Sequence, residues 1–182
     1  SDVATIVSKG SSLGLHLNPS KCEVISHSGS ISHPQFAGFR QFQPDSATLL
    51  GSPLTGGSAM DAAISASYDE LSRAVDRLQL ISSHDALVLL KNCLGGPKLQ
   101  HVLRTSPCCE HPKLLEIDNL LRSAVTQICN VHLSDVQWTQ ASLPVRSGGL
   151  GVRSVSKLAS SAFLASAAST LSLQTLILQK CQ

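Results

Sequence analysis

Apolar side chains recur at steps of three and four residues through the second two thirds of the chain. One stripe comprises Met60, Ile64, Tyr68, Leu71, Val75 and Leu78. A second stripe follows Pro112 and comprises Leu114, Ile117, Leu121, Val125 and Ile128. This spacing puts the apolar side chains on one face of an α-helix. The pattern therefore predicts two long helices, and the flanking Leu115, Leu120 and Ala124 predict that the second is central in a bundle.

Capping residues and helix breakers predict shorter helices around these two. Ser82 or Ser83 opens a helix that stops at Gly95-Gly96, and Pro97 then begins the next. Serine caps are also predicted at Ser134 and Ser154. The helix after Ser134 carries Trp138, which we expect to be a packing anchor, with stacking on a base as the alternative. The last segment, residues 171–178, is apolar almost all round.

The first 57 residues show a different pattern. A short helix is expected from Val3 to Leu13, followed by an edge strand in which Leu15 and Leu17 alternate with polar residues. Strands are expected from Cys22 and over Thr48 to Gly51, with a turn at Gly51-Ser52-Pro53. Three of the four phenylalanines lie at positions 36, 39 and 42, which we expect to pack rather than to form an exposed patch. We therefore predict an α+β, mainly α, fold with a small β-containing part over 1–57 and a helical domain over 58–182.

Composition narrows the class of protein. Apolar residues make up 42% of the chain and charged residues 14%, which is typical of an ordered domain, and 3% aromatics leave an aliphatic core. The net charge of +2 neither requires nor excludes nucleic acid. The six cysteines lack C-x-x-C spacing, so neither a zinc site nor a disulfide framework is expected. No long apolar run or secretory signal is found, so we expect no membrane partner and an intracellular location, nuclear or cytoplasmic.

Several short motifs carry a resemblance to a known family. Residues 14–23 read GLHLNPSKCE and lie between a predicted helix and a predicted strand, and residues 49–54 read LLGSPL. Further on, residues 143–153 read LPVRSGGLGVR and residues 162–166 read AFLAS. Together these resemble the reverse transcriptases of non-LTR retroelements, from palm motifs D and E into the C-terminal region. The resemblance implies that residues 1–57 end a polymerase palm and that residues 58–182 form a helical thumb.

The resemblance also implies a reaction for the parent protein. Such proteins are RNA-directed DNA polymerases that use two magnesium ions held by aspartates, and this chain contains no Asp-Asp pair. We therefore expect no cofactor in this chain, no activity for it alone, and two partners: an RNA/DNA template–primer and the remainder of the palm. Whether the chain belongs to an active enzyme stays open. The alternative is a stand-alone helical module, derived from a retroelement, that binds protein or RNA.

Candidate site residues follow from the same resemblance. Lys21 matches the motif D lysine, which could act beside the departing pyrophosphate. Leu50, Gly51 and Ser52 match the segment that steadies the primer end. Lys91, Lys98 and Arg104 are candidate phosphate contacts of thumb helices.

The glycine-rich loop over residues 144–153 is a further candidate. Its Gly148 and Gly149 could expose backbone N–H groups between Arg146 and Arg153, and an anion could sit at the N-terminus of the helix capped by Ser154. The loop lacks the residue order of a P-loop. A tight structural turn between helices is the alternative.

Overall fold

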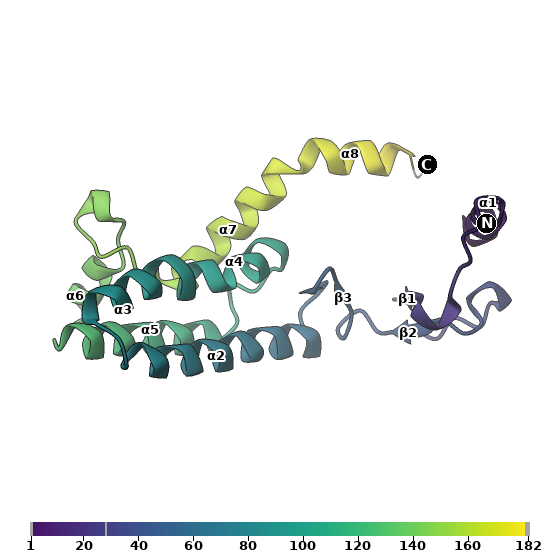
Figure 1. The fold of residues 1–182 in the computed structure, drawn as a ribbon. Coiled ribbons are helices and arrows are strands. Elements are labelled where there is room, and N and C mark those ends of the chain that lie inside the picture. Colours follow the sequence, from purple (N-terminus) through teal and green to yellow (C-terminus); the bar gives the residue numbers. More distant parts are fainter. Residues whose placement is uncertain (1, 28, 181–182) are drawn as a thin grey trace.

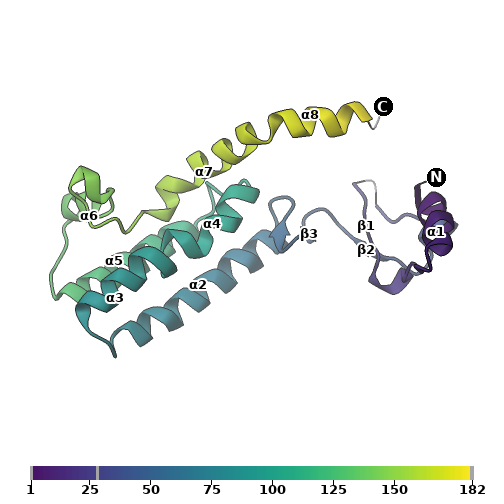
Figure 2. The same ribbon diagram turned by 45° about the horizontal axis from the view of Figure 1, so that its top comes forward.

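Helices account for most of the chain, and the predicted class, α+β and mainly α, is confirmed. The computed structural model describes residues 2–27 and 29–180. Figure 1 shows a helical bundle, a small N-terminal lobe set apart from it, and a C-terminal helical arm that extends from the bundle. The turned view in Figure 2 shows that the arm and the N-terminal lobe lie on the same side of the bundle.

The bundle is built on the two predicted long helices. They are α2 (Ser58–Leu78) and α5 (Lys113–Cys129), and they pack against each other. The predicted stripes are buried apart from Tyr68, which is partly buried against the core. Leu115, expected to widen the buried stripe, is 62% exposed, so that prediction is wrong. It lies one residue after Leu114, about 100° round the helix, where no neighbouring helix covers it.

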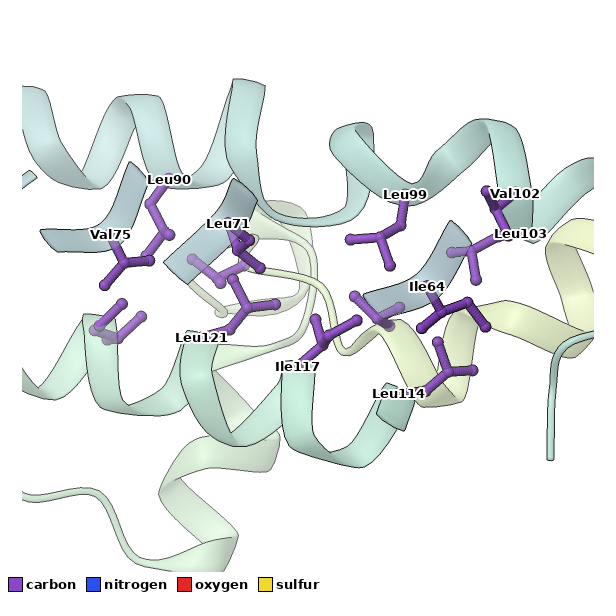
Figure 3. Packing of buried hydrophobic residues seen from close by; sticks show 14 of the residues in the cluster. Ile64, Leu71, Val75, Leu90, Leu99, Val102, Leu103, Leu114, Ile117 and Leu121 are labelled. Carbon is purple, nitrogen blue, oxygen red and sulfur yellow. The ribbon is translucent and has the colours of Figure 1, made fainter. Parts of the chain in front are cut away.

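Three further helices complete the bundle. The segment α3 (Ser83–Leu89) continues through a π-helical turn, η3 (Leu90–Leu94), into α4 (Gly96–Thr105). The helix α7 (Val155–Ser169) packs along α4 and touches α5. Figure 3 shows the leucine and isoleucine side chains of α2, α4 and α5 meeting in one cluster. The aliphatic core expected from the composition is the one observed.

The remaining C-terminal elements surround this core. A short helix, α6 (Asp135–Ala141), begins with a complete capping box between Ser134 and Gln137, and its Trp138 packs against the core as predicted. A 3-10 turn, η4 (Val145–Ser147), leads towards α7, and α8 (Leu171–Lys180) forms the arm. Within the described ranges no single helix is long and apolar enough to cross a membrane. Taken as a pair, α7 and α8 are together long and apolar enough for such a span, but the two helices are bent by 50° relative to each other.

The N-terminal lobe holds few regular residues. It consists of α1 (Asp2–Ser12), the 3-10 turns η1 (Pro19–Lys21) and η2 (Pro34–Phe36), and two parallel strands, β1 (Glu23–Ile25) and β2 (Arg40–Phe42). The edge strand expected at Leu15 and Leu17 is absent. In the described part of the chain those residues pair with no strand: the Leu15 N–H donates back to Gly10 O at the end of α1, and Asn18 caps the turn η1 that follows.

A small hairpin connects the lobe to the bundle. Its strands are β3 (Thr48–Leu49) and β4 (Ser52–Pro53), so the turn lies at Leu50-Gly51 and the predicted turn at 51–53 is wrong. Leu50 and Gly51 both have positive φ, which is the backbone conformation of a two-residue hairpin turn, so Ser52 and Pro53 form the returning strand. The Ser106 hydroxyl donates to the Pro53 carbonyl at 2.8 Å. The hairpin therefore packs on the helices, although the sequence motif had assigned it to the N-terminal part.

Candidate nucleic-acid interface

Charge is unevenly distributed over the bundle. No acidic residue occurs in residues 86–109 or after Asp135, and these stretches contain α4 and α7. The basic residues in them are Lys91, Lys98, Arg104, Arg146, Arg153, Lys157 and Lys180. By contrast α2 carries Asp61, Asp69, Glu70 and Asp76. Although the net charge of the chain is small, the charged side chains of the two adjoining helices α4 and α7 are all cationic.

Two of these cations line one hollow beside α7. The hollow encloses about 190 Å³, and its polar lining includes Arg153 and Lys157 together with Thr139, Ser142, Ser154 and Ser161. No carboxylate lines it, and no salt bridge involves either cation in the described part of the chain. Arg153 precedes the N-cap residue Ser154, and Lys157 lies in the first turn of α7. Sequence analysis missed Lys157; the absence of acidic residues after Asp135 was the signal that could have found it.

A third cation lies at the same end of α4 and α7. A Cβ on Gly151 would stand 2.8 Å from Cε of Lys91, so the lysine side chain crosses the glycine-rich loop there. Gly151 has φ +81°, and this backbone conformation favours glycine, whereas the flexible end of Lys91 could move aside. A Cβ on Gly96 would lie 3.8 Å from Cβ of Arg153. The fold therefore places Lys91 against the loop just before Arg153, while Arg153 and Lys157 line one hollow, and we call these three residues the cationic group.

The N-terminus of α7 is already filled by a carboxylate of the chain itself. Asp118 of α5 is buried, and it accepts the backbone N–H of Val155 at 2.6 Å and of Ser156 at 3.2 Å. The Ser154 hydroxyl also donates to it, at 2.7 Å. The expectation of a free anion site at this helix end is therefore wrong. An external phosphate near α7 can be held only by side chains.

The backbone N–H groups of the glycine-rich loop are used inside the loop. Gly148 donates to Val145 O at 3.0 Å, Gly149 to Pro144 O at 3.2 Å, and Gly151 to Leu143 O at 2.9 Å. A Cβ on Gly149 would stand 2.1 Å from the Leu143 carbonyl oxygen. The expectation that these glycines expose N–H groups is wrong, and the alternative, a tight structural turn, is what the structure contains. Arg146 is exposed within this loop.

The other predicted site residues lie in separate places. Lys98 pairs with Glu70 of α2 at 2.5 Å, and this lysine lowers the pKa of the glutamate. Arg104 lies near the far end of α4, in a hollow of about 400 Å³ that also involves His101 and Ser166. Lys21 is exposed in η1 of the N-terminal lobe. These residues do not join the group at Lys91, Arg153 and Lys157.

The predicted primer segment is at the tip of the hairpin. Leu50 is 90% exposed, whereas Ser52 is buried and bonded to the hydroxyls of Thr105 and Ser106. Among the described residues, no group of three or more His, Cys, Asp or Glu is placed to hold a metal ion. Comparisons with protein-family models, with curated proteins and with solved structures found no match to this chain.

Proposed function

We propose that this chain is the palm end and thumb of a reverse-transcriptase-like protein, and that its helical part binds the sugar-phosphate backbone of an RNA/DNA template–primer. The observation that carries the proposal is the group of Lys91, Arg153 and Lys157 at one end of two helices without acidic residues. The order of elements supports it too. A helix, a turn with Lys21, a strand, a hairpin and a helical bundle follow one another as the resemblance implies.

Phosphate recognition fits the chemistry of this group. Arginine offers a planar fork of donors to phosphate oxygens, and lysine offers a compact positive charge. Among the residues that the structure describes, neither Arg153 nor Lys157 has to leave a salt bridge in order to bind. Asp118 accepts hydrogen bonds at the N-terminus of α7, which holds the first turn that carries Lys157 and the N-cap residue that follows Arg153. Binding through phosphates would release counterions and would therefore weaken as salt rises.

The N-terminal lobe supports the remainder of a palm as a partner. Parallel strands occur almost only in sheets whose two faces are covered, and here two strands of three residues pair with neither face buried. Lys21 and the hairpin segment of Leu50, Gly51 and Ser52 would then meet the substrate only in the assembled palm. This chain contains no Asp-Asp pair, so we assign it no step of the magnesium chemistry.

The test is binding of the folded chain to a labelled RNA–DNA hybrid from about 50 to 200 mM salt. We expect Arg153→Ala/Lys157→Ala to weaken binding and to reduce the slope of log affinity against log salt by roughly 1–2, about one unit for each lost phosphate contact. The matched control is Arg73→Ala/Arg77→Ala on α2, which removes the same charge from exposed positions on the acidic helix.

Two results would contradict the proposal. One is the absence of binding at low salt by a chain whose helical circular dichroism is intact. The other is an equal loss of affinity in the α2 control, because binding would then follow net charge rather than this surface.

The C-terminal arm favours a second candidate function, a protein-interaction module. Leu171, Leu173, Leu176, Ile177 and Leu178 are each more than half exposed on α8. Two results together would support this alternative. The chain would bind no hybrid, and its self-association at micromolar concentration would disappear in the variant Leu173→Ser/Ile177→Ser, because these changes remove apolar surface without touching the bundle.

A further inference from the structure

The N-terminal lobe contains a hollow with aromatic walls. It is an open hollow of about 370 Å³ between residues 30 and 41, and His33, Phe36 and Phe39 line it. The described residues that line it include no Asp, Glu, Lys or Arg. Ser30, Ser32 and Gln41 supply polar groups to the lining. The phenylalanines were expected to pack: Phe36 and Phe39 pack on each other, and Phe42 lies in β2 opposite Ile25.

The aromatic rings are fixed relative to one another. The rings of Phe36 and Phe39 meet edge to face with centroids 5.7 Å apart, and His33 lies 6.0 Å from Phe36. Both phenylalanines are half-buried, so one part of each ring is supported while another part remains accessible. Edge-to-face pairs are a favoured aromatic geometry. The walls of the hollow are therefore preformed.

Gln41 holds the rim of the hollow in place. Its side-chain oxygen accepts the Ile31 N–H and the Ser30 hydroxyl, both at 3.0 Å, and its amide nitrogen donates to Ile31 O at 2.9 Å. These bonds tie the loop over 30–31 to β2 as a neighbouring strand would. Phe42, the next residue, lines a different hollow with Glu23 and Ile25.

We propose that this hollow is a stacking site for an unpaired nucleobase of a single-stranded segment. A flat, neutral, aromatic ring fits walls that are aromatic and contain no Asp, Glu, Lys or Arg, and polar groups at the rim match its ring nitrogens and exocyclic groups. The inference rests on the proposed function only in that nucleic acid is the ligand.

The turn η1, which ends at Lys21, lies against one edge of the hollow. Pro19 Cβ stands 3.3 Å from the position of a Cβ on Gly38, a lining residue, so the turn η1 abuts the hollow. Lys21 ends that turn, is exposed, and has no salt bridge in the described part of the chain. Single strands are bound with little sequence preference where aromatic stacking is combined with a cation, and Lys21 is the cation that this turn could supply.

The experiment measures quenching of 2-aminopurine fluorescence in a short single-stranded oligonucleotide titrated with the full chain. We expect quenching by the wild-type protein. Phe36→Leu and Phe39→Leu should each weaken it, by roughly 5- to 150-fold in affinity, because base–aromatic stacking is lost while apolar volume is kept. Phe36→Tyr should retain it. Phe42→Leu is the matched control from the same run, and it should bind as the wild type does.

The outcomes separate this inference from the proposed function. Absence of quenching by a wild-type chain that still binds the RNA–DNA hybrid would overturn the stacking site and leave the proposed function standing. Quenching that survives Arg153→Ala/Lys157→Ala but is lost in Phe36→Leu would support the stacking site even if hybrid binding failed. Equal losses in Phe36→Leu and Phe42→Leu would overturn it, because the lobe as a whole would then be responsible.

Discussion

At the scale of single residues, Asp118 contributes to the fold in a way that its position in the sequence conceals. It lies on the buried side of α5 among Ile117 and Leu121, where a carboxylate is costly unless it is hydrogen-bonded. Its partners are the N–H groups and hydroxyls at the start of α7, more than thirty residues later. One side chain therefore caps a helix and joins two elements of the bundle.

Replacing Asp118 by alanine should destabilise the protein by about 2–4 kcal/mol, since two backbone donors at a buried helix end lose their acceptor. Asp118→Asn keeps one acceptor oxygen and should cost less. Urea unfolding followed by circular dichroism measures both. Equal stability of Asp118→Ala and the wild type would show that water satisfies the helix end instead.

The adjacent cysteines Cys108 and Cys109 should differ in reactivity. Cys108 is buried and Cys109 exposed, and burial raises the pKa of the Cys108 thiol. Because the thiolate is the nucleophile, a raised pKa leaves less of it at any pH below that value. Iodoacetamide at mildly alkaline pH should therefore modify Cys109 before Cys108, as read by peptide mass spectrometry. In denaturant the rates of modification of Cys108 and Cys109 should become equal. A difference that persists in denaturant would contradict burial as the cause.

At the scale of elements, α5 organises the bundle because its buried face meets α2, α3 and α7. Leu121 is fully buried in that face (Figure 3), and Leu115 of the same helix is 62% exposed. Leu121→Ala should cost about 2–5 kcal/mol through lost burial and a cavity. Leu115→Ala should change stability by no more than about 0.5 kcal/mol. Thermal unfolding measures the stability of both variants. Similar losses of stability would mean that Leu115 is covered in solution.

At the scale of the whole molecule, the segment before α2 belongs with the bundle. The Thr55 hydroxyl donates to Pro44 O at 2.7 Å, and the Ala59 N–H donates to Asp45 O at 3.0 Å. Ala47 and Ser52 are buried. The predicted division at residue 57 remains a prediction, and these contacts favour an earlier one, near residue 44.

Two shortened chains test this division. Residues 44–182 should fold with the helical content of the bundle. Residues 58–182 should be less stable by about 1–3 kcal/mol, because Ser106 loses its buried partners Ser52 and Pro53. Thermal unfolding followed by circular dichroism measures the difference in stability between the two shortened chains. Equal melting temperatures would place the boundary at 57, as the sequence alone indicated.

The sequence by itself determined the features that depend on neighbours three or four residues away. The stripes of α2 and α5, the caps at Ser82, Ser134 and Ser154, and the aliphatic core all follow from local spacing and composition. Such features are set by helix periodicity and by side chains that satisfy nearby backbone groups, so tertiary contacts rarely alter them.

Only the tertiary structure decided the character of the candidate site. Whether the glycine-rich loop could bind an anion depended on carbonyl groups within a folded turn and on Asp118 of another helix. The grouping of Lys91 with Arg153 and Lys157 depended on how α4 and α7 pack, and so did the placing of the hairpin against Ser106. These are contacts between segments far apart in the chain, and no local pattern specifies them because their energies arise only when the segments meet.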